Sequence, residues 1–438
     1  MFKCAFYERE ITPPLGCDIP GYGSVRRGSD VKDRLMAKAL VISNGDEIFA
    51  FITVDACSLY FEVRNEIAKR VSERTPIKME NVLVAAIHTH TGIPDKYRHY
   101  DDAAFEEQKG YFDVFPKLIA DCAILAYKRL TESTLTFGVG DVKGISFCRD
   151  YIMKNATPRT NPGRLNSDII CPASPIDTEL PVLFVKDASG RPMGAVIAFA
   201  CHLDCVDGTE YSGDIASEIS KRLKNLYGYD FVTLFFMGTA GDINHFNVNI
   251  AGDPPDHYRR MGQKIVGEAL KVISFAEPVV GDTIIAKYEI LEIERHKVSK
   301  EELDRAKHII NTIKPIPGLK IAADNTSKEQ YDLMMARSLV KFYNDSPEVY
   351  EVPLHFIRLG DVKFYAFPGE IFCHFGITLK EKCNTNKRIV ASFCNRRIGY
   401  VPTRELVYDT IYESLPGSNC LDIEAGYIMT EKLLEMGR

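Results

Sequence analysis

Short apolar runs, many of them rich in β-branched residues, recur along the chain and alternate with longer stretches that have the spacing of amphipathic helices. Near the start, this pattern predicts strands at 38–43 and 47–55, a helix at 63–74 and a further strand at 81–87. The turn signal Asn44-Gly45-Asp46 joins the first two strands as a hairpin. The strand–helix–strand unit that follows predicts a parallel pair with a right-handed crossover.

The same alternation continues to the end of the chain. It predicts further strands at 135–139, 180–186, 194–201, 231–237, 282–295, 351–359, 362–367 and 388–394, and further helices at 105–129, 215–227, 261–275 and 424–436. A charged stretch at 297–345 predicts an inserted helical hairpin, whereas the Pro- and Gly-rich residues 1–35 predict an ordered loop, and 148–177 a long loop. We therefore predict that residues 1–438 form a single α/β domain, with a mixed, largely parallel sheet flanked by helices.

Several predicted strands end close to side chains that bind metals. The side chains are His88 and His90, then His202, then Glu370. Because alternate residues of a strand share a face, the first two are expected to point the same way. The carboxyl ends of strands that share a direction meet at one edge of a sheet, which would bring all four together. Two or three histidines with one carboxylate are typical of a catalytic zinc site.

Each of these side chains also has a purely structural interpretation. Buried histidines are often hydrogen-bonded to the main chain. Glu370 stands where a helix is predicted to begin, a position that suits the helix dipole. Cys201 and Cys205 flank His202 with a spacing that no standard zinc finger uses, so we interpret both as neighbours in the core. The recurrence of polar groups at several strand ends favours the metal site.

Composition narrows the class of protein. The 438 residues are 45% hydrophobic and 26% charged, as in ordinary globular proteins, and the net charge of −6 argues against a nucleic-acid surface. No apolar run approaches the roughly 18 residues of a membrane span. Glu8, Arg9 and Glu10 lie where a signal peptide would need an apolar stretch, so a cytoplasmic location is expected. Twelve cysteines without a C-x-x-C pair suggest reduced thiols.

Eight short segments stand in a fixed order along nearly the whole chain. They are ITPP at 11–14, HTHTG at 88–92, Arg149, AFACH ending at His202, GTAGD at 238–242, PGE at 368–370, GYVPT at 399–403 and YES at 412–414. In this order they resemble the catalytic domain of the neutral (non-lysosomal) ceramidase family, without its C-terminal β-sandwich domain.

The resemblance implies a zinc-dependent amide hydrolase with defined site residues. The implied metal ligands are His88, His202, Glu370 and Tyr400. The implied contacts to the substrate and transition state are His90, Arg149 and Tyr412. Zinc lowers the pKa of bound water to about 7, and positioned donors stabilise negative charge that develops on a carbonyl oxygen. A buried Tyr whose hydroxyl bonds to the main chain is the alternative at the last ligand position.

The chain departs from the family pattern after GTAGD, where the family carries a serine close to the metal. Asn244 stands there and is no nucleophile, so metal-activated water is favoured over an acyl-serine route. His245 is a candidate for a substrate contact or a proton carrier, or is a plain loop histidine. Asp55 and Asp214 are candidates to support a ligating imidazole, or to act in a cap or turn. The polar loop at 92–103 favours a small, soluble amide over ceramide.

Taken together, these patterns predict a zinc-dependent hydrolase that cleaves a carbon–nitrogen amide bond of a small, soluble substrate by metal-activated water. One alternative is a metal-dependent hydrolase or isomerase of an ester, a lactone or a sugar derivative, because Asn244 and His245 change the pocket. Another is a non-catalytic metabolite-binding protein with a structural metal. No nucleic-acid partner is expected, and no pattern indicates an oligomeric state.

Overall fold

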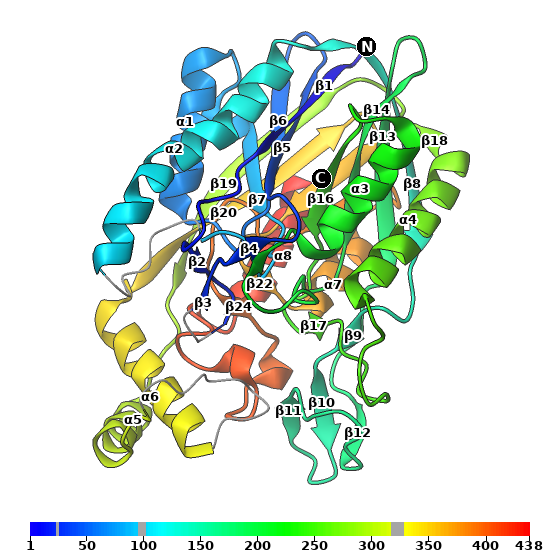
Figure 1. Ribbon diagram of the computed structural model, residues 1–438. Helices are drawn as coiled ribbons and strands as arrows, with labels where there is room; N and C mark the ends of the chain where they lie inside the picture. The colour runs from blue at the N-terminus through cyan, green and yellow to red at the C-terminus, as the bar shows by residue number, and fades with distance from the viewer. Residues whose placement is uncertain (23–25, 95–101, 317–327) are drawn as a thin grey trace.

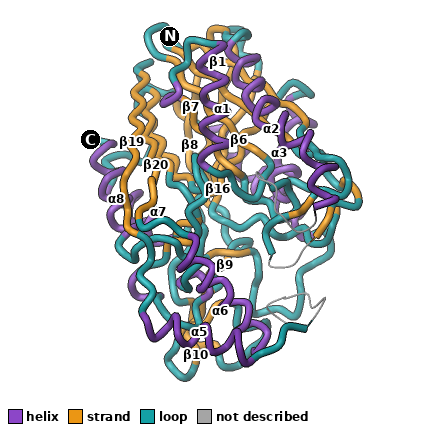
Figure 2. The backbone as a smooth tube through the Cα atoms, turned by 90° about the vertical axis from the view of Figure 1, so that its left-hand side faces the viewer, coloured by secondary structure: helices purple, strands orange, loops and turns teal. Residues whose placement is uncertain are grey.

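Two β-sheets pack face to face, and helices cover the outer side of each sheet (Figures 1 and 2). The computed structural model describes residues 1–22, 26–94, 102–316 and 328–438. The large sheet has the strand order β16 (Val232–Met237), β14 (Pro192–Phe199), β13 (Glu179–Asp187), β8 (Thr131–Asp141), β1 (Lys3–Glu10), β5 (Met36–Ser43), β6 (Ile48–Val54) and β7 (Val82–Ala86), with β18 (Glu277–Pro278) beside β8. The small sheet has the order β19 (Ile284–Glu294), β20 (Val349–Leu359), β21 (Val362–Ala366) and β23 (Arg388–Ala391).

Three hydrophobic layers follow from this arrangement. The outer face of the large sheet is covered by α1 (Phe61–Arg74), α2 (Asp102–Tyr127), α3 (Asp214–Tyr227) and α4 (His257–Phe275). The small sheet carries α7 (Cys373–Lys382) and α8 (Ala425–Met436) on its far side. Between the sheets, the Phe364 ring lies 5.2 Å from the Phe51 ring and 5.0 Å from the Phe236 ring. Strands of the large sheet are therefore buried on both faces, which explains their nearly continuous apolar runs.

The prediction of a mixed α/β sheet is confirmed, but the prediction that it is largely parallel is wrong. Only the β6–β7 and β14–β16 pairs of the large sheet are parallel among the described strands. The other pairs are antiparallel. Short connections account for the β5–β6 and β13–β14 pairs, since the turns at Asn44–Glu47 and Asp187–Arg191 allow only antiparallel neighbours. The two parallel pairs are those connected through α1 and α3.

The prediction of a loop over residues 1–35 is also wrong in part, because β1 is a central strand. It pairs with β5 along eight residues. The sequence pattern did not indicate this strand, because its last residues are charged. Arg9 donates to Asp121 of α2, and Glu8 pairs with Lys224 of α3. Polar residues on this strand are thus matched by charges on the covering helices. On its other side β1 meets β8 through only two residue pairs, which form a short seam in the sheet.

The large sheet curls, so that β16 packs near β5, β6 and β7 although they stand far apart in strand order. The segment after β23 closes the gap between them. The Ser392 amide donates to Met237 (2.8 Å), and the Asn395 amide donates to Val84 (2.7 Å). Beyond the strand ends, the His90 amide donates to the Leu203 carbonyl (2.9 Å). The curl brings the segments that follow β7 and β14 into contact.

Two regions lie at the same end of the molecule as these segments. The stretch predicted as a helical hairpin contains α5 (Lys300–Thr312) and α6 (Lys328–Asp345), which pack on each other (Figure 1). The predicted long loop instead contains a small sheet of β11 (Pro158–Thr160), β10 (Asp150–Met153) and β12 (Ile169–Pro172). Among the described residues, no helix combines the length and the apolar character needed to cross a bilayer.

Candidate metal centre

Three of the predicted ligands lie close together beyond the carboxyl ends of the strands. They are His88, His202 and Glu370, and we call them the inner group. One ligand atom from each lies within 4.8 Å of the other two, and all three residues are buried. The Oε2 atom of Glu370 is 3.6 Å from the Nε2 atom of His88 and 3.6 Å from the Nε2 atom of His202. These separations are too long for hydrogen bonds and close to the edge of a metal coordination shell.

Main-chain carbonyls hold both imidazoles of the inner group. The Nδ1 atom of His88 lies 2.7 Å from the Cys57 carbonyl, and the ring stacks on Phe393 at 4.0 Å. The Nδ1 atom of His202 lies 2.9 Å from the Ala240 carbonyl and 2.8 Å from the Ile243 carbonyl. A proton on each Nδ1 atom satisfies these carbonyls and leaves each Nε2 atom free as a metal ligand.

The local backbone differs from the strand and helix ends that we predicted. His88 lies beyond β7 in the left-handed region, at φ +65°, so the alternation of a strand does not apply to it. The rings of His88 and His90 nevertheless meet, with 3.1 Å between their Nε2 atoms. Glu370 does not start a helix: it lies in β22 (Glu370–Ile371), and α7 begins at Cys373. The Gly369 backbone, at φ +69°, turns the chain into that short strand.

The side chains of the inner group fit a divalent metal ion. The Nε2 atom of His202 and the Oε2 atom of Glu370 are buried without a hydrogen-bond partner among the described residues. Such orphaned atoms are rare and costly unless an ion or water satisfies them. Burial lowers the pKa of both His88 and His202, so the rings are neutral. Burial alone would raise the pKa of Glu370, but the two histidines and Tyr400 hold it well below its usual range. Neutral imidazoles and a carboxylate are the donors that zinc prefers.

Tyr400 is placed beside the inner group by strand pairing. It lies in β24 (Tyr400–Val401), which pairs with β22 so that Tyr400 is opposite Glu370. Burial raises the pKa of its hydroxyl well above the usual range, and Glu370 adds to this rise whereas Arg149 opposes it. The Arg149 guanidinium lies 5.0 Å from the centre of the Tyr400 ring. The Tyr412 ring lies 5.6 Å from the Tyr400 ring, so a second phenol borders the same space.

Arg149 is held by a residue that sequence reasoning missed. Its guanidinium pairs with Glu413, and both side chains are buried. Glu413 also accepts from Thr160 (2.7 Å). Burial would lower the pKa of Arg149, but Glu413 and its other neighbours raise it well above its usual range, so Arg149 stays charged. The YES motif contained the signal, because its middle residue is a carboxylate.

The remaining predicted residues lie on one side of the inner group. The Asn244 amide donates to Asn161 (3.0 Å), and its oxygen accepts from the Phe246 amide (2.9 Å), so its side chain is held in the loop structure. The Nε2 atom of His245 faces Asp204 at 3.3 Å. Asp204 was not predicted, and only its place two residues after His202 could have drawn attention to it.

Asp55 and Asp214 do not support the ligating imidazoles. Asp55 accepts from the Met36 amide (2.9 Å), and Asp214 accepts from the Val206 amide (2.7 Å). Neither bond is a helix cap, because each carboxylate holds a main-chain amide of another segment, and main-chain carbonyls orient the imidazoles instead. Most of the polar loop predicted to favour a soluble substrate, at 95–101, lies outside the described residues.

Comparisons with known proteins agree with this geometry. Residues 8–229 match the family model described as neutral/alkaline non-lysosomal ceramidase, N-terminal. Neutral ceramidase B of Dictyostelium discoideum is 23% identical over 244 residues, covering 52% of this chain and 33% of that protein. Neutral ceramidase A of the same organism is 22% identical, covering 46% and 28%. Neutral ceramidase of Pseudomonas aeruginosa is 22% identical, covering 65% and 43%. The aligned part of the chain spans less than half the length of each relative.

Solved structures show the same fold over the whole chain. The crystal structure of neutral ceramidase from Pseudomonas aeruginosa superposes with a TM-score of 0.74 at 19% identity, covering 100% of this chain and 74% of that one. A structure described as ceramidase complexed with C2 superposes with a TM-score of 0.75 at 18% identity, with the same coverage.

Proposed function

The chain belongs to the neutral/alkaline non-lysosomal ceramidase family, and on that premise we propose that it is a metal-dependent hydrolase that cleaves a carbon–nitrogen amide bond. One observation carries the proposal: the inner group places two neutral imidazoles and a carboxylate together, with buried atoms that no other side chain satisfies. Zinc is the metal that this donor set fits best.

His88, His202, Glu370 and Tyr400 would hold the metal, which supplies a Lewis acid that polarises a carbonyl and makes water more acidic. Around them, charged and polar side chains are already fixed. Arg149 keeps a positive charge beside the Tyr400 hydroxyl, where it favours negative charge that develops nearby. His90 is neutral because burial lowers its pKa well below its usual range, so its ring can accept a proton or donate one.

No serine pathway is proposed. The side chain at position 244 is an amide that already bonds to Asn161 and to the Phe246 amide. It has neither a nucleophilic oxygen nor a free orientation, so water is the attacking group in the proposed reaction.

The substrate is proposed as an N-acyl amide. The names of the relatives point to ceramide and do not match the predicted small, soluble substrate, although they describe longer proteins. The Asp204 carboxylate and the His245 imidazole, 3.3 Å apart next to the inner group, suit polar substituents near the amide. The two substrates to compare are therefore a ceramide with a short acyl chain and a matched soluble N-acyl amide, because their relative rates distinguish a lipid from a soluble substrate.

The first test is the metal content of protein that has been loaded with zinc and then dialysed. The expected result is that His88→Ala and His202→Ala each bind one equivalent fewer than wild type. Cys171→Ser, an exposed cysteine, serves as the control and should bind as wild type does. Unchanged zinc in both histidine variants would remove the basis of the proposal.

The second test is hydrolysis of amides and matched esters by the zinc-loaded protein. Turnover of at least one amide, abolished in His202→Ala, is expected. Turnover of esters alone would replace the amide proposal with the ester alternative. Tight binding without any turnover would favour the non-catalytic metabolite-binding protein.

A further inference from the structure

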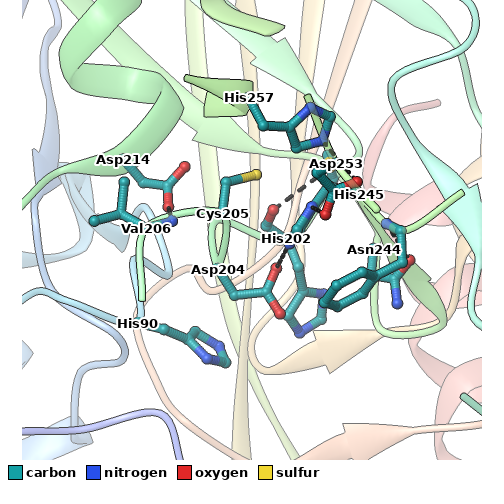
Figure 3. Close-up of polar contacts among 12 residues, drawn as sticks. His90, His202, Asp204, Cys205, Val206, Asp214, Asn244, His245, Asp253 and His257 are labelled. Atoms are coloured by element: carbon teal, nitrogen blue, oxygen red, sulfur yellow. Dashed lines mark hydrogen bonds and ion pairs between the residues drawn. The ribbon is translucent and has the colours of Figure 1, made fainter. Parts of the chain in front are cut away.

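A second cluster of metal-binding side chains lies next to the inner group. Ligand atoms of Cys205, His245 and His257 all lie within 4.8 Å of one another. Cys205 follows β14, His245 follows β17 (Ile243–Asn244), and His257 is the first residue of α4. Figure 3 shows the Cys205 sulfur, the His257 ring and the Asp253 carboxylate gathered on the same side of the His245 ring. We call these four residues the outer group.

The Asp253 carboxylate lies beside the two histidines of this cluster. Its Oδ2 atom is occupied by Arg164, whereas its Oδ1 atom lies 3.8 Å from the Nε2 atom of His257. The Nδ1 atom of His245 lies 4.0 Å from the same carboxylate. Zinc bonds of about 2.0–2.3 Å place tetrahedral ligand atoms roughly 3.3–3.8 Å apart, so small side-chain shifts complete this geometry.

Four nitrogen and oxygen atoms of the outer group are buried without a hydrogen-bond partner among the described residues. They are the Nδ1 and Nε2 atoms of His245, the Nε2 atom of His257 and the Oδ1 atom of Asp253. The His245 side chain is 4% exposed. Polar atoms in such surroundings normally have partners, and here the orphaned atoms face one another. The Cys205 thiol has only a weak contact with the Met261 sulfur at 3.5 Å.

The surroundings orient both imidazoles as they would be in a metal site. The Nε2 atom of His245 faces the Asp204 carboxylate at 3.3 Å, which leaves its Nδ1 atom toward the cluster. A carboxylate behind a histidine is the usual support for a metal ligand. The Nε2 atom of His257 faces the Asp253 carboxylate. A cavity of about 320 Å³ lined by Cys205, Asp253 and His257 gives an ion a path from solvent.

We propose that Cys205, His245, His257 and Asp253 form a second metal site that binds a zinc-type divalent ion. One thiolate, two imidazoles and one carboxylate are a donor set for zinc or cobalt and a poor one for calcium or magnesium. Cys205 packs against the hydrophobic core, as the sequence interpretation expected, and the proposal adds a ligand role to that packing. It does not depend on the proposed hydrolase function, because none of its ligands belongs to the inner group.

Cobalt is the probe for the test, because a cysteine thiolate bound to Co²⁺ gives a charge-transfer absorption in the near ultraviolet. Wild-type protein loaded with Co²⁺ is expected to hold two equivalents and to show this band. Cys205→Ser should lose the band, and His257→Ala should lose one equivalent. The His257 side chain is 17% exposed at a helix end, so its truncation leaves the core intact.

Two controls separate this site from the inner group. His202→Ala should lose one equivalent of Co²⁺ but keep the thiolate band, so failure of the inner site leaves the second site measurable. Cys171→Ser, which removes a remote exposed thiol, should change neither quantity. A band that persists in Cys205→Ser, or two equivalents retained by His257→Ala, would overturn the proposal.

Discussion

His88 and His202 of the inner group and His245 of the outer group are the same kind of side chain in opposite electrostatic settings. His88 and His202 are held by main-chain carbonyls, and burial lowers the pKa of both rings. Burial also acts to lower the pKa of His245, but Asp204, Asp214 and Asp253 together raise it. The comparison shows that an imidazole with neutral partners stays unprotonated and can bind a metal ion directly. Carboxylate partners instead favour a positive charge at the imidazole, which is either a proton or a metal ion.

The largest expected effect comes from Glu370→Gln, which separates the two groups. Loss of the only carboxylate of the inner group should weaken its metal affinity by more than about 100-fold. Mutation of a residue that merely supports a metal ligand already lowers affinity by about 10–100-fold. The outer group should be unaffected. Competition titration with a chelating dye measures both affinities. Equal weakening at both sites would show that the two groups act as one site.

The second prediction concerns the ion pair that supports the inner group. Glu413→Gln leaves the Arg149 charge buried without its partner, and the two side chains are only 8% and 0% exposed. The free energy of unfolding should fall by about 3–5 kcal/mol, which is the usual cost of breaking a buried pair. Denaturant unfolding of the metal-free protein measures it. A loss below about 1 kcal/mol would mean that solvent reaches Arg149.

The third prediction is a pH dependence from Asp55, the buried carboxyl next to the segment that holds His88. Burial raises the pKa of Asp55 from 3.8 to about 6. Because the folded state holds this proton more tightly, its contribution is complete below about pH 4 and is lost as pH rises through 6. Asp55→Asn removes this loss, so above pH 7 the variant should be more stable than wild type by up to about 3 kcal/mol.

The matched measurement is unfolding of both proteins at several pH values between 4 and 8. The stability difference should grow with pH across that window. A difference that does not change with pH would show that Asp55 titrates normally, and that only its bond to Met36 matters.

The smallest expected effect comes from Asp253→Asn in the metal-free protein. This variant breaks an ion pair of the outer group, as Glu413→Gln breaks the ion pair next to the inner group. The pair of Arg164 and Asp253 is 20% and 21% exposed, so solvent screens it. Its loss should lower the free energy of unfolding by about 1 kcal/mol or less. A cost as large as that of Glu413→Gln would show that the outer group is as rigidly supported as the inner one.

The inner group could be predicted because its side chains follow strands. An apolar run that ends in a histidine is visible in one sequence, and strand ends meet in the fold. His88, His202 and Glu370 were found in this way, and the resemblance added Tyr400. The details of their backbone, such as the left-handed conformation of His88, depend on contacts with residues that are distant in the sequence. A local sequence pattern contains no information on those contacts.

The outer group could not be predicted, because Cys205, His245 and Asp253 come from three loops and His257 from a helix start, with no shared spacing. Their meeting depends on the curl of the large sheet and on the turn before α4. The strand direction failed for a related reason. Apolar runs that are buried on both faces look alike in parallel and antiparallel sheets, and only the short turns distinguish them.

The two-residue seam between β1 and β8 has a mechanical consequence for the inner group. Only Lys3 with Glu132 and Cys4 with Thr131 pair across it, at the edge of the sheet away from the histidines. His88 comes from the half of the sheet that contains β7, and His202 from the half that contains β14. An ion that joined the two imidazoles would therefore add a cross-link between the two halves, close to the hydrogen bond from the His90 amide to the Leu203 carbonyl. It would stiffen both halves against splaying, and hydrogen exchange in β1 and β8 would slow although neither strand touches the ion.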